Sequence, residues 1–156
     1  MNQVLLSSSR MDWETPKTFF DALDYEFHFT LDPCCLAATQ KCKFGYPADR
    51  GFDGLKESWE THRVFMNPPY GKDIKKWVVK AYEESQRGVL VVCLLPARTD
   101  TSWWWDYCMK GDIRFIRGRI KFKGLNKYGK LTNWNATFPS AVVIFNPKKE
   151  ENGNRL

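Results

Sequence analysis

The spacing of hydrophobic residues along the chain predicts helices and strands in alternation. Residues 74–82 place their large apolar side chains at i, i+3, i+4, i+7 and i+8, which is the stripe of a helix that buries one face: Ile74, Trp77, Val78, Ala81 and Tyr82. A similar stripe, Phe19, Phe20, Leu23 and Phe27, predicts an earlier helix. Either Thr15 caps that helix with Pro16 in its first turn, or the cap lies one turn later. A third helix is predicted over residues 102–109.

Short apolar runs predict strands between these helices, at residues 27–31, 63–66, 89–95, 112–116 and 141–145. The run at 89–95 is apolar throughout, as expected for a strand inside a parallel sheet that is covered on both faces. Strands and helices in this order are typical of an α/β fold. Residues 33–53 show no firm period, and the stretch 121–130, rich in Lys, Gly and Asn, is predicted to be an exposed loop.

The length and composition predict one domain. A chain of 156 residues with 43% hydrophobic residues suffices for one core. We expect a loose N-terminal arm at 1–11, a domain at 12–145 and a polar tail at 146–156. The longest apolar run is too short to cross a bilayer, and the N-terminus lacks the apolar segment of a secretory signal. The five cysteines are therefore expected to be reduced thiols of a cytoplasmic protein.

The net charge weakly favours a polyanionic partner. The formal charge is +6 and the pI is about 9.1, and lysines and arginines bind phosphates by displacing their counterions. Seven Trp, six Tyr and eleven Phe can fill a core or stack on bases.

The most informative segment is Asn67-Pro68-Pro69-Tyr70, which directly follows the strand predicted at 63–66. The amine of an adenine base is a poor nucleophile, because its lone pair is delocalised into the ring. Two acceptors that take both amino hydrogens would localise that lone pair, and the Asn67 side-chain carbonyl and the Pro68 backbone carbonyl are such acceptors. Tyr70 could stack on the flat base. A merely structural loop is the alternative for the isolated motif.

An ordered set of motifs over residues 12–145 resembles the phage-type DNA N-6-adenine methyltransferases, the Dam family. The set consists of Asp12-Trp13-Glu14-Thr15-Pro16, Leu31-Asp32-Pro33-Cys34, Asp53-Gly54-Leu55 with Trp59, the Asn67 loop, Leu94-Leu95-Pro96-Ala97-Arg98, Gly118-Arg119-Ile120-Lys121-Phe122 and Phe138-Pro139-Ser140.

The resemblance implies an enzyme that transfers a methyl group from S-adenosylmethionine directly to the N6 amine of a flipped adenine in double-stranded DNA. It implies a compact Rossmann-like fold with a mostly parallel central sheet and no separate target-recognition domain, so that loops such as 121–136 would read sequence. It also suggests a phage or prophage gene expressed in the cytoplasm of a bacterial host. We expect a monomer or weak homodimer, and the sequence does not choose between them.

Residue roles follow from the same resemblance. Asn67, Pro68, Pro69 and Tyr70 would form the catalytic loop, and the cofactor would contact Trp13, Thr15, Pro16, Asp32, Pro33 and Asp53. The target base and its phosphates would contact Tyr70, Arg98, Arg119, Lys121 and Phe122, with Arg117 and Lys123 as further phosphate candidates. Structural alternatives are a turn acid at Asp32 or Asp53, a helix cap at Thr15 and core packing at Phe122.

One departure from most Rossmann-type methyltransferases is visible. No glycine follows Asp32 before Gly45, and only twenty residues separate Asp32 from Asp53. The motif does not identify the acid that would bind the cofactor ribose, and Asp49 is the candidate.

Other functions remain possible from the sequence. The same loop chemistry could methylate RNA adenine or a protein glutamine, and an inactive DNA-binding relative is conceivable. A zinc-dependent binding module would use Cys34, Cys35 and Cys42 with His62 or His28. Adjacent cysteines at irregular gaps do not match paired C-x2-C ligands, so no metal is expected.

Overall fold

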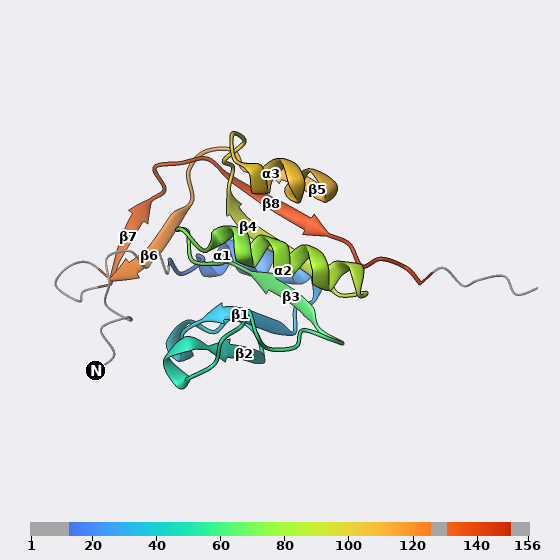
Figure 1. Ribbon diagram of the computed structural model, residues 1–156. Coiled ribbons are helices and arrows are strands. Elements are labelled where there is room, and N and C mark those ends of the chain that lie inside the picture. The colour runs from blue at the N-terminus through green and yellow to red at the C-terminus, as the bar shows by residue number, and fades with distance from the viewer. Residues whose placement is uncertain (1–12, 126–130, 151–156) are drawn as a thin grey trace, which may run out of the picture.

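A computed structural model describes residues 13–125 and 131–150 of the chain (Figure 1). In chain order its elements are α1 (Lys17–Phe27), β1 (Leu31–Cys35), the 3-10 turn η2 (Ala37–Thr39), β2 (Phe44–Pro47), the turn η3 (Ala48–Arg50), β3 (Arg63–Met66), α2 (Ile74–Gln86), β4 (Leu90–Pro96), α3 (Ser102–Asp106), the turn η4 (Cys108–Lys110), β5 (Asp112–Phe115), β6 (Lys121–Leu125), β7 (Leu131–Asn135) and β8 (Ser140–Phe145).

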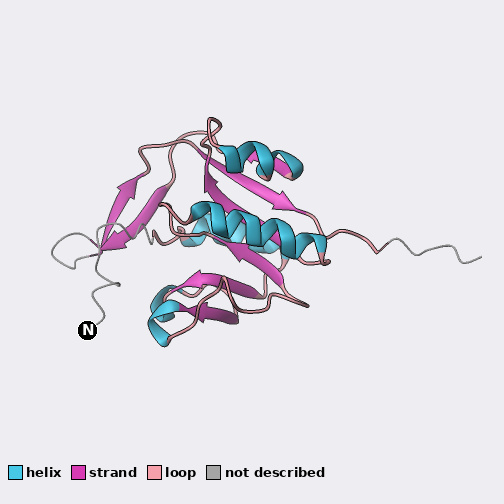
Figure 2. Ribbon diagram, in the orientation of Figure 1, coloured by secondary structure: helices cyan, strands magenta, loops and turns pink. Residues whose placement is uncertain are grey.

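Six of the described strands form one sheet, in the order β2-β1-β3-β4-β8-β5. The first four strands in this order are parallel, and β8 is inserted antiparallel between β4 and β5. Helices α1 and α2 lie on opposite faces of the sheet (Figures 1 and 2). The predicted α/β class with a mostly parallel central sheet is therefore confirmed.

The core lies along β4 and β8. Every residue of both strands is buried. Helices cover both faces of the sheet (Figure 1), so neither face of these central strands is exposed to water. The stripe predicted on residues 74–82 packs α2 against this core through Ile74, Trp77, Val78 and Ala81. Strands β3, β4, β5 and β8 and helix α2 thus follow the predicted pattern within a residue or two.

The start of α1 differs from the prediction. The helix begins at Lys17, Pro16 occupies the N-cap position, and no side chain caps the helix. Thr15 does not cap α1, because its hydroxyl oxygen accepts a hydrogen bond from the Asn67 side chain instead.

The strand predicted at residues 27–31 is wrong. Helix α1 continues to Phe27, and His28 ends it in the left-handed conformation with φ of 54°. The strand β1 begins only at Leu31 and runs through Pro33 to Cys35. Pro33 has no N–H to donate, and the pairing of β1 with β2 is irregular between Asp32 and Cys35.

The exposed loop predicted at residues 121–130 is also wrong in its first half. Residues 121–125 form β6, which pairs antiparallel with β7 in a separate two-stranded ribbon. Residues 126–130 lie outside the described residues, as do the arm predicted at 1–11 and the end of the predicted tail, 151–156. The helix predicted at 102–109 is shorter, since α3 ends at Asp106 and a 3-10 turn follows.

Within residues 13–125 and 131–150, no helix is both long and apolar enough to cross a membrane.

Candidate active site

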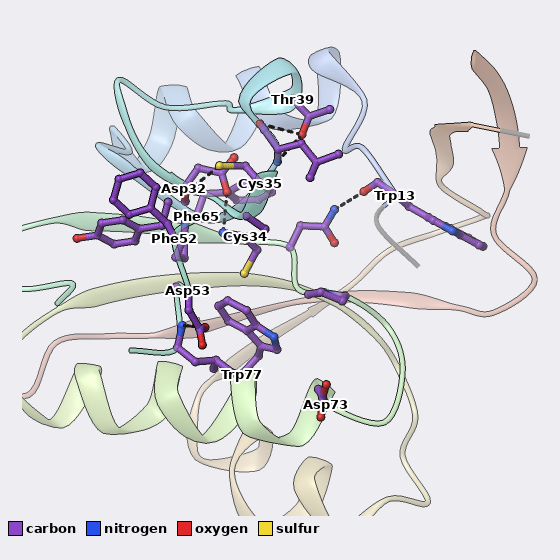
Figure 3. A pocket seen from close by; sticks show the side chains of 18 of the residues that line it. Trp13, Asp32, Cys34, Cys35, Thr39, Phe52, Asp53, Phe65, Asp73 and Trp77 are labelled. Atoms are coloured by element: carbon purple, nitrogen blue, oxygen red, sulfur yellow. Dashed lines mark hydrogen bonds between the residues drawn. The ribbon is translucent and has the colours of Figure 1, made fainter. Parts of the chain in front are cut away.

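A pocket of about 870 Å³ opens at the carboxyl ends of β1 and β3. The chain leaves β1 toward β2 on one side of the sheet, whereas β3 and β4 lie on the other side. Such a reversal of strand order creates a crevice between two neighbouring strands, where open α/β sheets bind ligands. Figure 3 shows Trp13 at one side of the pocket and Phe52 with Asp53 at the other, with Asp32 and Cys34 between them.

Asn67 lies at this crevice because it is the first residue after β3. Its side-chain Nδ2 donates to the Trp13 carbonyl oxygen at 2.7 Å and to the Thr15 hydroxyl at 3.0 Å. Both bonds use the nitrogen, and the Oδ1 atom makes no hydrogen bond to another described residue. The amide is therefore held with its carbonyl available as an acceptor.

The loop members do not all face the pocket. Pro69 lines the pocket beside Asn67, whereas Pro68 and Tyr70 are buried and do not. Among the predicted cofactor contacts, the pocket is lined by Trp13, Thr15, Asp32, Pro33 and Asp53, and Pro16 is not among its lining residues. The fold thus brings together residues that are far apart in the sequence.

Asp32 is a buried carboxylate in the pocket wall, only 3% exposed. One of its oxygens accepts from the Cys34 N–H at 3.2 Å and the other from the Lys41 N–H at 3.0 Å. Burial raises the pKa of Asp32 to about 7, although these hydrogen bonds oppose the shift. Asp32 therefore accepts the hydrogen bond that closes the turn at Cys34 and also lines the pocket. A cation placed against its carboxylate would favour the charged form.

Asp53 reaches the pocket because Gly54 packs directly against β1. A Cβ atom at Gly54 would collide with the backbone oxygen of Pro33, so only glycine allows this approach. The Asp53 carboxylate accepts from the Leu55 N–H at 3.0 Å, and the Trp59 indole donates to the Gly54 carbonyl at 2.9 Å. The motif holds an exposed acid at the pocket rim.

Four aromatic residues that line the pocket were not among the residues singled out from the sequence for the site: Tyr46, Phe52, Phe65 and Trp77. Phe52 is 45% exposed and lies beside Asp53, and Trp77 comes from the first turns of α2. An aromatic residue next to Asp-Gly was the only available signal for Phe52. Trp77 was predicted as part of the apolar stripe, and it serves both as core and as pocket wall.

Asp49 does not line the pocket. Its carboxylate accepts from the Ala37 N–H at 2.8 Å and so links η3 to η2. Turns η2 and η3, with strand β2 between them, occupy the segment that leads from β1 toward Asp53.

Four aromatic rings pack together next to Asn67: Trp13, Tyr70, Phe122 and Phe138. Tyr70 and Phe122 meet edge to face, with centroids 6.1 Å apart and ring planes at 90°. The Tyr70 hydroxyl donates to the Leu94 carbonyl at 2.9 Å, and burial raises its pKa well above the ordinary value. Tyr70 is therefore a neutral, buried hydrogen-bond donor.

The predicted phosphate contacts are exposed and lie toward the same end of the sheet. Arg98 follows β4, Arg117 and Arg119 lie between β5 and β6, and Lys121 and Lys123 lie on β6. Phe122, between the two lysines, is fully buried.

The cysteines considered as zinc ligands have other surroundings. Cys35 is buried and its thiol donates to the Asp32 carbonyl, and burial raises the pKa of Cys42. In the described part of the chain, no three His, Cys, Asp or Glu side chains are grouped so that they could hold a metal ion.

The fold and the pocket define a mixed α/β protein with a crevice whose wall includes Asn67 and Pro69 of an Asn-Pro-Pro-Tyr loop. The chain belongs to the DNA N-6-adenine-methyltransferase (Dam) family, whose sequence model matches residues 3–154. Membership implies methylation of the adenine N6 amine and a DNA substrate. A comparison with curated proteins finds no match.

Proposed function

We propose that the protein methylates the N6 amine of a flipped adenine in double-stranded DNA with S-adenosylmethionine as the methyl donor. The orientation of Asn67 is the main support. With Nδ2 bound to Trp13 and Thr15, the amide presents an acceptor and not a donor, which is what an amino group requires.

The charged and aromatic groups that line the pocket suit the parts of S-adenosylmethionine. The buried Asp32 carboxylate suits the ammonium of the methionine part. Asp53 suits the adenine amine, and the exposed ring of Phe52 beside it offers a stacking surface. These groups line one continuous pocket that Asn67 also lines.

In the proposed reaction Asn67 Oδ1 and the Pro68 carbonyl accept the two amino hydrogens of the base. The N6 lone pair then forms the new bond to the methyl carbon as the carbon–sulfur bond breaks, and one N6 proton leaves to water. S-adenosylmethionine supplies the methyl group already activated on a sulfonium, so the chain provides orientation and polar acceptors.

A target base must leave the duplex to reach Asn67. Tyr70 and Phe122 are the aromatic pair that would hold the base, but their edge-to-face contact leaves no parallel gap between them. A base stacked on Tyr70 therefore requires Phe122, and with it the β6–β7 ribbon, to shift.

Replacement of Asn67 by alanine tests the proposal. Asn67→Ala should lose at least ~10²-fold in turnover, the scale of removing one preorganised polar group, while calorimetry shows S-adenosylmethionine binding near wild type. Asn146→Ala is a matched control, because Asn146 is exposed and bonds Asp112 away from the pocket. Tritium transfer to duplex DNA, RNA and protein substrates would identify the acceptor. Transfer to RNA or protein in preference to DNA would refute the proposal, as would wild-type turnover in Asn67→Ala.

A further inference from the structure

The β6–β7 ribbon has one buried and one polar face. Phe122 and Trp134 lie opposite each other on one face. Phe122 is fully buried in the aromatic group, and Trp134 is 44% exposed. On the other face Lys121 lies opposite Asn135, and Lys123 lies opposite Asn133. All four of these side chains are exposed, and none makes a hydrogen bond or ion pair to another described residue.

The ribbon stands apart from the six-stranded sheet at one side of the molecule (Figure 1). It is nevertheless fixed to the site. The backbones of Lys123 and Glu14 exchange two hydrogen bonds, of 2.8 and 3.1 Å, and Glu14 lines the pocket. The ring of Phe122 packs on Trp13 and Tyr70. The polar face is therefore presented to solvent by an element that contacts the catalytic loop.

The dimensions of this face match a DNA groove. The major groove of B-DNA admits a two-stranded β-ribbon. Side chains two residues apart on a strand are about 6.8 Å apart, and base pairs are about 3.4 Å apart along the duplex. The pair Lys121–Asn135 and the pair Lys123–Asn133 are therefore separated by about two base-pair steps. Asparagine pairs with the N6 and N7 atoms of adenine, and lysine with the O6 and N7 atoms of guanine.

We propose that this polar face of the ribbon lies in the major groove beside the target adenine and reads flanking base pairs through Asn133, Asn135, Lys121 and Lys123. The inference rests on the proposed function, because it takes duplex DNA as the substrate. It assigns phosphate positioning to the exposed arginines Arg98, Arg117 and Arg119 and base recognition to the ribbon.

Charge supports duplex DNA as the occupant. The chain has a formal charge of +6, and the ribbon face has two unpaired ammonium groups with no described carboxylate bound to them. The nearest acid along the backbone pairing, Glu14, is already paired with Lys41 at 2.7 Å. Lysines alone would bind phosphates of any sequence, whereas the two asparagines add donors and acceptors at fixed positions next to them.

The test uses a pool of duplex oligonucleotides with one central adenine and randomised flanking base pairs. Full-length wild type and the variants Asn133→Ala, Asn135→Ala, Lys121→Ala and Lys123→Ala are incubated with the pool and S-adenosylmethionine. Sequencing of the methylated fraction then gives the preference at each flanking position. Each variant should relax the preference at one or two positions, by roughly 5- to 150-fold, and leave the others unchanged. Asn146→Ala should leave the profile unaltered.

Arg117→Ala is the comparator for phosphate contact. It should reduce methylation of all sequences by a similar factor and lower the salt dependence of DNA binding. If the ribbon variants behave like Arg117→Ala, or keep the wild-type profile while folded by circular dichroism, base reading by the ribbon is refuted. A wild type that methylates duplex DNA without flanking preference refutes it too. A wild type that does not methylate duplex adenine refutes the proposed function itself, which is a separate outcome.

Discussion

The hydroxyl of Thr15 accepts a hydrogen bond from the side-chain nitrogen of Asn67 at 3.0 Å, across 52 positions of sequence. Thr15 is 2% exposed, so water does not readily replace this bond. Together with the Trp13 carbonyl it fixes which end of the Asn67 amide is available to a substrate. We therefore propose that Thr15 positions Asn67 and acts through it.

Thr15→Val should lower kcat about 2- to 12-fold with little change in KM for DNA, because one neutral hydrogen bond contributes about 0.5–1.5 kcal/mol. Thr15→Ser, which keeps the hydroxyl, should restore most of the rate. Steady-state kinetics separate the two parameters. In the Asn67→Ala background, Thr15→Val should have little further effect, since the bond is already absent. Additive losses would show that Thr15 acts independently of Asn67.

Binding of S-adenosylmethionine should weaken as the pH falls below about 7. The pKa of buried Asp32 is raised from 3.8 to about 7, so the ligand-free protein protonates Asp32 below that pH. A bound ammonium requires the charged form, and affinity should fall by up to about tenfold per pH unit. Calorimetry at about pH 8 and about pH 6 checks this.

Asp32→Asn is the control for that titration, since any titration of the cofactor itself is common to both proteins. Its pH dependence should be flatter, and identical profiles would remove Asp32 from the site. The stability of the ligand-free protein depends on pH in the opposite direction to its affinity for the cofactor. A raised folded-state pKa stabilises the fold below pH 3.8, and this contribution is lost as the pH rises through about 7.

Tyr70→Phe should keep most of the activity and lower the free energy of unfolding by about 1 kcal/mol, because only the bond from the hydroxyl to Leu94 is lost. Tyr70→Ala should lower it by roughly 3–5 kcal/mol, as for removal of a buried ring, and should also slow turnover. Denaturant titration and kinetics measure both quantities. Tyr25→Ala, at a residue 86% exposed, is the matched control. A Phe variant as inactive as Asn67→Ala would assign the function to the hydroxyl and not to the ring.

Phe52→Ala should weaken S-adenosylmethionine binding roughly 5- to 150-fold, the range for loss of one base–aromatic stack. The protein should remain folded, because the ring is 45% exposed. Phe44 is the matched control, since it is 50% exposed but outside the pocket. Equal cofactor affinities for the two variants would mean that Phe52 does not stack on the cofactor.

The sequence predicted best those elements whose signal is local. Strand β4 is a continuous apolar run, α2 has a complete stripe, and the Asn67 loop is marked by two prolines directly after a strand. The elements that the sequence predicted wrongly depend on contacts with distant parts of the chain. The run at 27–31 alternates like a strand, yet the left-handed conformation of His28 ends a helix there, and pairing with β2 and β3 begins only at Leu31.

Several residues that line the pocket were predicted from the sequence, but their relative positions were not. Lys121–Leu125 has two lysines and a glycine, a composition typical of a loop, and becomes a strand because Phe122 is buried and β7 supplies the pairing. The bond between Thr15 and Asn67 has no local signature. Phe52 lies in a stretch without periodicity, two residues after the turn η3, and its place in the pocket wall has no local signature.

The extended segment of Trp13, Glu14 and Thr15 has three different attachments on three consecutive residues. Trp13 packs against the ring of Phe122, Glu14 pairs with the backbone of Lys123, and Thr15 holds Asn67. A displacement of the ribbon by DNA would therefore be transmitted at once to the pocket wall and to the Asn67 amide. By thermodynamic linkage, DNA and cofactor then change each other's affinity by the same factor, so the segment would make the two ligands cooperative, with the sign set by the direction of that displacement.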